Sequence, residues 1–234
     1  MVHAALSYGG VAVARRPEEA CAALFFDDAT RSPKLARPDG VALNYGCHDI
    51  TKSRVGEAFA RAFGYELTLD PRAHIGVAVC KSETNSRHDG RVIECPCEPV
   101  PGTVVQRLVD TGGDDHVLDL RTQVVGGRPV SVYPKRRPKA DRFNSISNLE
   151  VTLVDPATVF SDEERAAIGR FCEVMGLDWG TLDVLRDRHD GRLYVVDANK
   201  TDVGPMLSLP LREQFRSIRL ASEALLAMLP PGFD

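Results

Sequence analysis

Three oxygen-bearing side chains near the C-terminus have the types and spacing that suit a hard cation. Asp183 interrupts the apolar stretch from Thr181 to Arg186, and Asp197 and Asn199 end a second one, from Arg192 to Asn199. A tight turn would fold Asp183 back beside Asp197, and alternation places Asp197 and Asn199 on one strand face. Carboxylates beside a core repel one another without a cation, and oxygen ligands suit Mg²⁺. The pattern predicts a magnesium site, with two surface carboxylates on a solvated hairpin as the alternative.

Helices and hairpins must hold these residues, and apolar periodicity predicts where they lie. A helix capped by Asp49 or Thr51 ends at Gly64, and a capping box of Ser161 and Glu164 opens another that ends at Gly176. The weaker N-terminal pattern predicts a helix over 17–24 and a strand over 40–45. Further expected elements are hairpins over 75–95 and 117–133, a strand over 104–109, strands over 181–186 and 192–199, and a C-terminal amphipathic helix over 211–229.

Composition bounds the class of protein. The chain has 234 residues, 43% of them apolar and 26% charged, which fits one large domain or two small lobes. A formal charge of −4 gives no overall attraction to nucleic acid or to an anionic membrane. No apolar run approaches the roughly 20 residues of a membrane span, and no secretion signal opens the chain, so we expect a cytoplasmic protein. Cys95 and Cys97, with Cys47 and His48, lack the second ligand pair that a zinc site needs.

The order of Asp183, then Asp197-Ala198-Asn199, then Gly204-Pro205 resembles the ATP-grasp superfamily. In that family a strand aspartate, a hairpin and an acidic-x-Asn strand end, followed by Gly and Pro, form the metal site. The family usually carries Glu where this chain has Asp197. The resemblance covers most of the chain and implies ATP and Mg²⁺ as cofactors, with Asp183, Asp197 and Asn199 as the metal ligands.

The same resemblance implies a set of nucleotide contacts. Lys81 stands where the family places a lysine at the end of a strand, and Ser82 opens the loop to Asp89 that would cover the phosphates; the alternative is a solvated lysine. Lys52 begins the first helix and is similar to the family's other nucleotide-contacting lysine, with an exposed first-turn lysine as the alternative. The stretch Val105 to Val109 looks like the inter-lobe strand that reads adenine. The implied contacts there are Gln106, Arg107 and Leu108, with Asp110 near the ribose.

Arg121 is similar to the family's arginine that faces the transferred phosphate, and pairing with Asp119 is the alternative. A guanidinium suits bidentate contact with phosphate or carboxylate. Five cations follow within eight residues: Lys135, Arg136, Arg137, Lys139 and Arg142. Such a run is usually a solvated face, but here it indicates handling of ATP phosphates or of an acidic acceptor, whereas RNA binding lacks interleaved aromatic residues. We assign Lys135 to the nucleotide, and Arg142 to catalysis with Arg121 and Lys81.

The expected fold class is α+β, an ATP-grasp fold with two lobes and the nucleotide between them. The expected domains are a short N-terminal α/β stub over 1–50, a small lobe over 51–101 and a large lobe with the metal site over 102–234. The stub is shorter than the domain that commonly precedes an ATP grasp. We therefore expect that a homodimer, a partner chain or a macromolecular substrate would complete the acceptor site.

The leading hypothesis for function is a ligase that activates a substrate carboxylate as an acyl phosphate for attack by an amine or another nucleophile. The acceptor could be a small molecule, a peptide or a glycan carboxylate. One alternative is a kinase that phosphorylates a hydroxyl of a small molecule or sugar, since the same apparatus can do so. A second alternative is a nucleotide-binding module of a partner enzyme, without turnover. The sequence has no G-x-S-x-G elbow to favour a Ser-His-Asp hydrolase.

Overall fold

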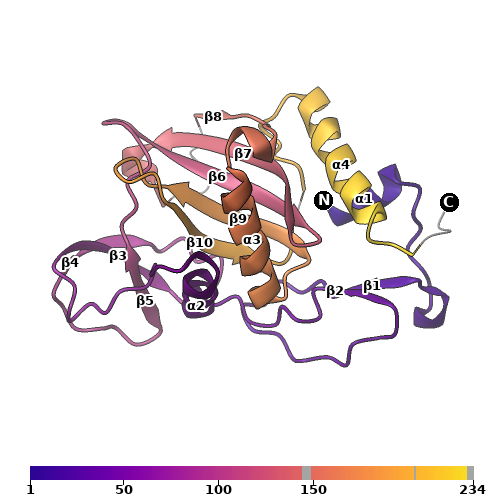
Figure 1. Cartoon of the computed structure of the whole chain (residues 1–234), viewed down its shortest axis with the longest axis horizontal. Coiled ribbons are helices and arrows are strands. Elements are labelled where there is room, and N and C mark those ends of the chain that lie inside the picture. Colours follow the sequence, from indigo (N-terminus) through magenta and orange to yellow (C-terminus); the bar gives the residue numbers. More distant parts are fainter. Residues whose placement is uncertain (144–148, 203, 231–234) are drawn as a thin grey trace.

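The computed structural model describes residues 1–143, 149–202 and 204–230. Within these ranges the chain forms a five-stranded and a three-stranded antiparallel sheet, a short parallel strand pair, and helices α1 to α4 (Figure 1). None of the described helices is both long and apolar enough to cross a membrane.

The five-stranded sheet is the frame of the larger part of the molecule. Its strand order is β10-β9-β6-β7-β8, with every neighbouring pair antiparallel. The strands are β6 (His116–Val125), β7 (Arg128–Pro138), β8 (Glu150–Val151), β9 (Trp179–Arg186) and β10 (Leu193–Asn199). The expected hairpins β6–β7 and β9–β10 are present. Strand β7 runs five residues past its expected end at Tyr133, into the basic run. That extension places the cations of the run on a strand.

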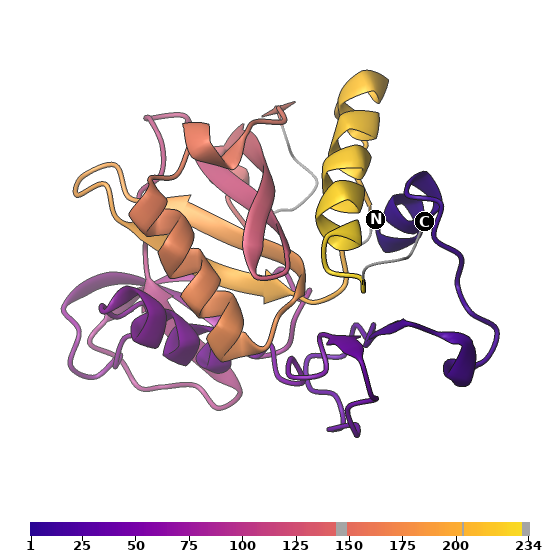
Figure 2. The ribbon, with the colours of Figure 1, turned by 45° about the vertical axis from the view of Figure 1, so that its right-hand side comes forward.

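The two faces of this sheet differ in chemistry because its residues alternate. One face carries apolar side chains such as Leu120, Val132 and Leu182, which form the main core with helices α2 (Lys52–Phe63) and α3 (Asp162–Met175). Figure 2 shows α3 on one side of the sheet and α4 (Leu211–Leu226) on the other. The face opposite α3 packs apolar side chains such as Val125 and Trp179 against α4, and its polar part, which we call the polar face, carries the candidate site.

Both expected helix boundaries of α2 and α3 are confirmed. Thr51 caps α2 by accepting a hydrogen bond from the Arg54 amide, and Gly64 ends it in the left-handed conformation. The capping box of Ser161 and Glu164 opens α3. Local sequence therefore fixes both helices that cover the core face.

The smaller sheet has the order β4-β3-β5, with β3 (Gly76–Ser82), β4 (Arg91–Cys95) and β5 (Thr103–Arg107). Register pairs Val79 with Gln106 and Lys81 with Val104, so Lys81 and Gln106 share one face. The opposite face packs a separate small core of Ala78, Cys80, Cys95 and Val105. Helix α2, which we expected in the small lobe, packs its apolar side chains into the main core with α3 and β10.

The N-terminal region differs most from expectation. Pro17 to Leu24 is not one helix: a 3₁₀ turn covers Pro17–Glu19, and β1 (Ala22–Leu24) pairs in parallel with β2 (Val41–Leu43). Helix α1 (Val2–Tyr8), which the sequence analysis did not predict, packs beside α4 (Figure 2). Two further 3₁₀ turns cover Lys139–Asp141 and Pro156–Thr158.

Candidate functional site

The polar face of the five-stranded sheet brings the three predicted metal ligands together. Asp183 on β9 lies directly opposite Asp197 on β10, and Asn199 follows two residues along β10. The register shifts between Val195 and Asp197, so Val196 is an extra residue in the ladder. Without this bulge Asp197 would face the apolar core, because a one-residue slip reverses every side chain. The bulge therefore turns Asp197 onto the same face as Asp183.

Arg121 lies next to this pair. It is opposite Asp183 in the ladder between β6 and β9, and its Nη1 atom is 3.1 Å from Asp183 Oδ1. Lys135 Nζ, from β7, is 3.9 Å from the same oxygen. Burial alone would raise the pKa of Asp183, but the guanidinium of Arg121 and the ammonium of Lys135 hold it below its ordinary value. Asp183 therefore stays ionised, as a metal ligand must.

The alternative pairing of Arg121 with Asp119 does not form. Asp119 instead pairs with Arg137, at 2.8 Å. Lys135 and Arg137 point to the polar face of the sheet and Arg136 to the other, because β7 alternates through the basic run. The run is therefore split: Lys135 and Arg137 are buried, whereas Arg136 and Lys139 are exposed.

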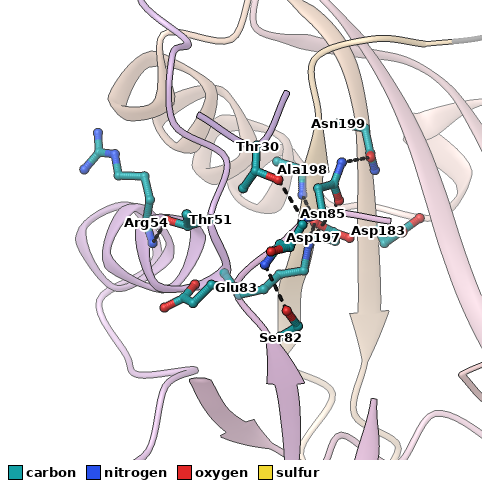
Figure 3. A network of polar contacts seen from close by, with 12 residues as sticks. Thr30, Thr51, Arg54, Ser82, Glu83, Asn85, Asp183, Asp197, Ala198 and Asn199 are labelled. Carbon is teal, nitrogen blue, oxygen red and sulfur yellow. Dashed lines mark hydrogen bonds and ion pairs between the residues drawn. The ribbon is translucent and has the colours of Figure 1, made fainter. Parts of the chain in front are cut away.

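Lys52 and the loop after β3 close the site from the side of the small sheet. Lys52, the first residue of α2, places Nζ 2.7 Å from Asp197 Oδ1 and 3.1 Å from Asn85 Oδ1. Asn85 Nδ2 donates to Asn199 Oδ1 at 2.9 Å, and the Asn85 amide donates to Thr30 Oγ1 at 2.9 Å. Figure 3 shows Asn85 between the strand that carries Asp197 and Asn199 and the N-terminal segment that carries Thr30.

Lys81 also faces this centre, with its side chain half-buried at the end of β3. Burial lowers the pKa of Lys81 from its ordinary value, against the attraction of Asp197. Among the described residues, no hydrogen bond or ion pair is formed by its ammonium. Ser82 is held within the loop: its amide donates to Asp89 and its hydroxyl accepts from the Thr84 amide.

The segment predicted to read adenine covers the end of β5 and the residues that follow it. Gln106 is fully buried on the face of β5 that carries Lys81, and neither atom of its amide has a hydrogen-bond partner within the described part of the chain. A cavity of about 420 Å³ lies at the residues that follow Gln106, and Gln106 itself is not part of its lining. The residues that line it are Val77, Arg107, Leu108, Asp110, Lys139, Arg142, Asp187, His189 and Asp190. Three of the four predicted adenine and ribose contacts therefore border one cavity.

Two of the predicted residues differ from their expected surroundings. Arg107 places its guanidinium 5.8 Å from the centre of the Tyr194 ring. Arg142, which we grouped with the catalytic residues, donates to the Val109 carbonyl at 3.0 Å and borders the same cavity. Burial lowers the pKa of Arg142. Its contacts are thus with the inter-lobe segment, and its catalytic role stays a prediction.

The sequence analysis missed several side chains that the structure places at the site. Asn85 lies in the loop that was expected to cover the phosphates, but nothing in the sequence signals its contacts, which span 33 and 114 residues. Gln123 donates to the buried carboxylate of Asp202 at 2.8 Å, behind Arg121. The alternation along β6 could have identified Gln123, because it lies two residues from Arg121.

The donor set fits Mg²⁺ better than a softer metal. Two carboxylates and one amide oxygen leave coordination positions for water and phosphate oxygens, which is how Mg²⁺ is usually held. The described residues contain no group of three or more His, Cys, Asp or Glu that could hold a metal by themselves, so the zinc alternative gains no support.

No protein-family model and no curated protein sequence matches the chain significantly. Among solved structures, the ATP-grasp ligase PsnB complexed with a minimal precursor, Mg and ADP matches with a TM-score of 0.52 and 18% identity, over 81% of this chain and 62% of PsnB. A RimK-domain ATP-grasp protein from Sphaerobacter thermophilus DSM 20745 matches with a TM-score of 0.51 and 16% identity, over 89% of this chain and 81% of that protein.

These matches confirm the predicted α+β fold class. The chain has the ATP-grasp fold. It spans less than two thirds of the length of PsnB. At these identities the likeness concerns the fold, and the chemistry must be argued from the site itself.

Proposed function

We propose that this chain is an ATP- and Mg²⁺-dependent ligase that activates a carboxylate as an acyl phosphate for attack by an amine or another nucleophile. The observation that carries the proposal is the polar face of the large sheet. There Asp183, Asp197 and Asn199 lie on the neighbouring strands β9 and β10, and the cations Lys52, Arg121 and Lys135 contact the two carboxylates. Neighbouring oxygen ligands with cations beside them are the equipment for a metal-bound polyphosphate.

Each side chain has a role that follows from its position. Asp183, Asp197 and Asn199 would hold Mg²⁺, which when bound neutralises charge on the phosphate oxygens. Lys52, at the start of α2, and Lys81, at the end of β3, lie on the side of the small sheet and would bind the phosphates from there. Lys52 now pairs with Asp197, and a phosphate oxygen can replace this carboxylate as its partner.

Arg121 and Lys135 approach the same point from the sheet itself. Arg121 would orient the substrate carboxylate against the γ-phosphate and stabilise the charge that develops during transfer. Lys135, buried beside Asp183, would stabilise the negative charge of the transferred phosphate. The basic run thus contributes to the reaction through the side chains that alternation turns inward.

The segment around Gln106 and the neighbouring cavity would bind the nucleoside. Gln106 has a buried amide without a partner in the described chain, and such a group costs free energy until a ligand satisfies it. The cavity lined by Arg107, Leu108 and Asp110 would take the base and ribose, and Ser82 would contact the phosphates from the covering loop. These assignments orient the γ-phosphate toward Arg121.

The candidate acceptors are the small-molecule, peptide and glycan carboxylates expected from the sequence. PsnB was crystallised with a minimal precursor, Mg and ADP, which supports a test of peptides alongside small carboxylic acids. A homodimer or a partner chain that completes the acceptor side, and a cytoplasmic location, stay predictions from the sequence.

The experiment measures ADP release from ATP and Mg²⁺ over a panel of carboxylic acids and peptides, with hydroxylamine as the trapping nucleophile. A ligase gives ADP together with a hydroxamate of the accepted carboxylate, because hydroxylamine attacks an acyl phosphate. A kinase gives ADP and a phosphorylated hydroxyl that hydroxylamine leaves intact. Tight nucleotide binding without ADP release from any compound would instead identify a binding module, and either of these results would refute the ligase proposal.

A further inference from the structure

Asn85 joins three parts of the molecule that are distant in sequence. Its side chain contacts Lys52 of α2 and Asn199 of β10, and its backbone amide contacts Thr30 of the N-terminal region. Asn85 is half-buried, and its position in a loop would otherwise leave its amide free to rotate. These contacts fix both the loop and the side chain (Figure 3).

The chemistry of the partners fixes which way each amide points. The ammonium of Lys52 can only donate, so Asn85 must turn its Oδ1 atom toward Lys52. Its Nδ2 group, which can only donate, then faces Asn199. Asn199 must therefore present Oδ1, and not Nδ2, on this side of its carboxamide.

The loop is anchored at Glu83 and at the Asn85 amide, so this orientation does not depend on one bond. Glu83 accepts hydrogen bonds from the amide of Ser53, at 3.0 Å, and from its hydroxyl, which ties the loop to the first turn of α2. Thr30 accepts from the Asn85 amide on the other side. The anchors hold Asn85 within 2.9 Å of Asn199 Oδ1.

From this geometry we infer that Asn85 is a positioning residue of the metal site: it orients the carboxamide of Asn199 so that oxygen faces the cation. The inference rests on the proposed function, since it assigns a partner to one of the proposed metal ligands. An amide oxygen has two lone pairs, so Asn199 Oδ1 can accept from Asn85 and ligate Mg²⁺ at once. Outer partners of this kind typically change metal affinity by about 10- to 100-fold when removed.

The test measures Mn²⁺ affinity by electron paramagnetic resonance, in the presence of saturating ADP, with Mn²⁺ in place of Mg²⁺. We expect Asn85→Ala to weaken Mn²⁺ binding about 10-fold, while ADP affinity measured in EDTA stays as in the unmodified protein. Asn85→Ser serves as a second variant if the first folds poorly. Arg61→Ala, an exposed residue of α2, is the control, and we expect its Mn²⁺ affinity to be unchanged.

A double-mutant cycle shows whether Asn85 acts through Asn199. In the Asn199→Ala background, Asn85→Ala should cause no further loss of Mn²⁺ affinity. An equal loss in both backgrounds, or Mn²⁺ affinity that is unchanged or higher in Asn85→Ala alone, would overturn the inference while leaving the proposed function intact. Failure of the unmodified protein to bind Mn²⁺ with ADP would overturn both the inference and the proposed function. This result is distinguishable from the others because it needs no variant.

Discussion

At the scale of single residues, the site is a set of opposite charges that balance each other before any ligand arrives. Asp183 faces Arg121 and Lys135, and Asp197 faces Lys52. Buried ions need such partners, because removing one leaves the other charge uncompensated. The same charges can be shared with a bound Mg²⁺ and a triphosphate, since each cation then finds phosphate oxygens and each carboxylate finds the metal.

The role of Arg121 predicts a large loss of turnover when its guanidinium is removed. Arg121→Ala should lower kcat by about 100- to 1,000-fold, because it removes the hydrogen-bond donor that stabilises the negative charge that develops during phosphate transfer. Arg128→Ala, which removes an exposed arginine of β7, should leave kcat unchanged. The measurement is ADP release at saturating ATP, and comparable rates for the two variants would contradict the assignment.

The lowered pKa of Lys81 predicts how nucleotide binding depends on pH. Burial lowers this pKa from its ordinary value of 10.5, so the free protein loses the charge of Lys81 earlier as pH rises. Phosphate favours the charged lysine, and nucleotide affinity should therefore fall with rising pH on the alkaline side. Lys81→Arg keeps its charge there and should show a smaller fall in calorimetric titrations from pH 7 upward; identical profiles for the two proteins would refute this role.

At the scale of elements, caps and turns decide where each functional strand and helix stands. Gly176 ends α3 in the left-handed conformation, with a φ of 66°, and leads the chain directly into β9 and Asp183. A Cβ atom added at Gly176 would lie 2.7 Å from the Gly46 Cα atom, in the N-terminal region. The glycine is therefore required by backbone conformation and by a close approach of two segments.

A matched pair of glycine variants separates these two requirements. Gly64→Ala and Gly176→Ala both place alanine at a positive φ, which costs about 1–2 kcal/mol. Gly64 has open space around its Cβ position, whereas Gly176 has backbone within 2.7 Å. In urea unfolding, Gly176→Ala should therefore lose more stability than Gly64→Ala. Equal losses would contradict this, because they would show that the Gly46 backbone moves aside without a loss of folding free energy.

Much of this element structure follows from local sequence, and the part that does not has a physical cause. The caps at Thr51 and Ser161 and the alternation around Asp183 and Asp197 lie within a few residues of the element they specify, so they could be predicted. The bulge at Val196 could not, because only the partner strand shows which residue is extra. The helix expected over 17–24 is wrong because pairing with Val41–Leu43 recruits Ala22–Leu24 into a strand, a contact between distant segments.

At the scale of the whole molecule, the N-terminal region is bound to the large sheet at its functional end. The Asn44 side chain donates to the carbonyls of Trp179 and Lys200 and accepts from the amides of Asp178 and Trp179. Lys200, the residue after Asn199, is fully buried and donates to Ser32. Docking of the N-terminal region is therefore coupled to the strand that carries two of the proposed metal ligands.

Removal of the Asn44 side chain should loosen this docking. Asn44 has a φ of 61°, so Asn44→Gly avoids backbone strain and removes only the side-chain hydrogen bonds. Buried backbone groups without partners should cost about 1–3 kcal/mol. Hydrogen exchange over residues 20–50 should accelerate in Asn44→Gly but not in Asp28→Gly, an exposed position in the same region. Equal protection in both variants would contradict the docking role.

The central claim is that Asp183, Asp197 and Asn199 hold Mg²⁺ against the triphosphate of ATP. Calorimetric titration with a non-hydrolysable ATP analogue, in Mg²⁺ and in EDTA, tests it most directly for the unmodified protein and for Asp183→Asn. We predict that Mg²⁺ strengthens binding to the unmodified protein. In Asp183→Asn this gain should be lost, while metal-free affinity is equal or higher because Arg121 and Lys135 lose their counterion. Binding that is the same with and without Mg²⁺, or a full Mg²⁺ gain in Asp183→Asn, would contradict the account.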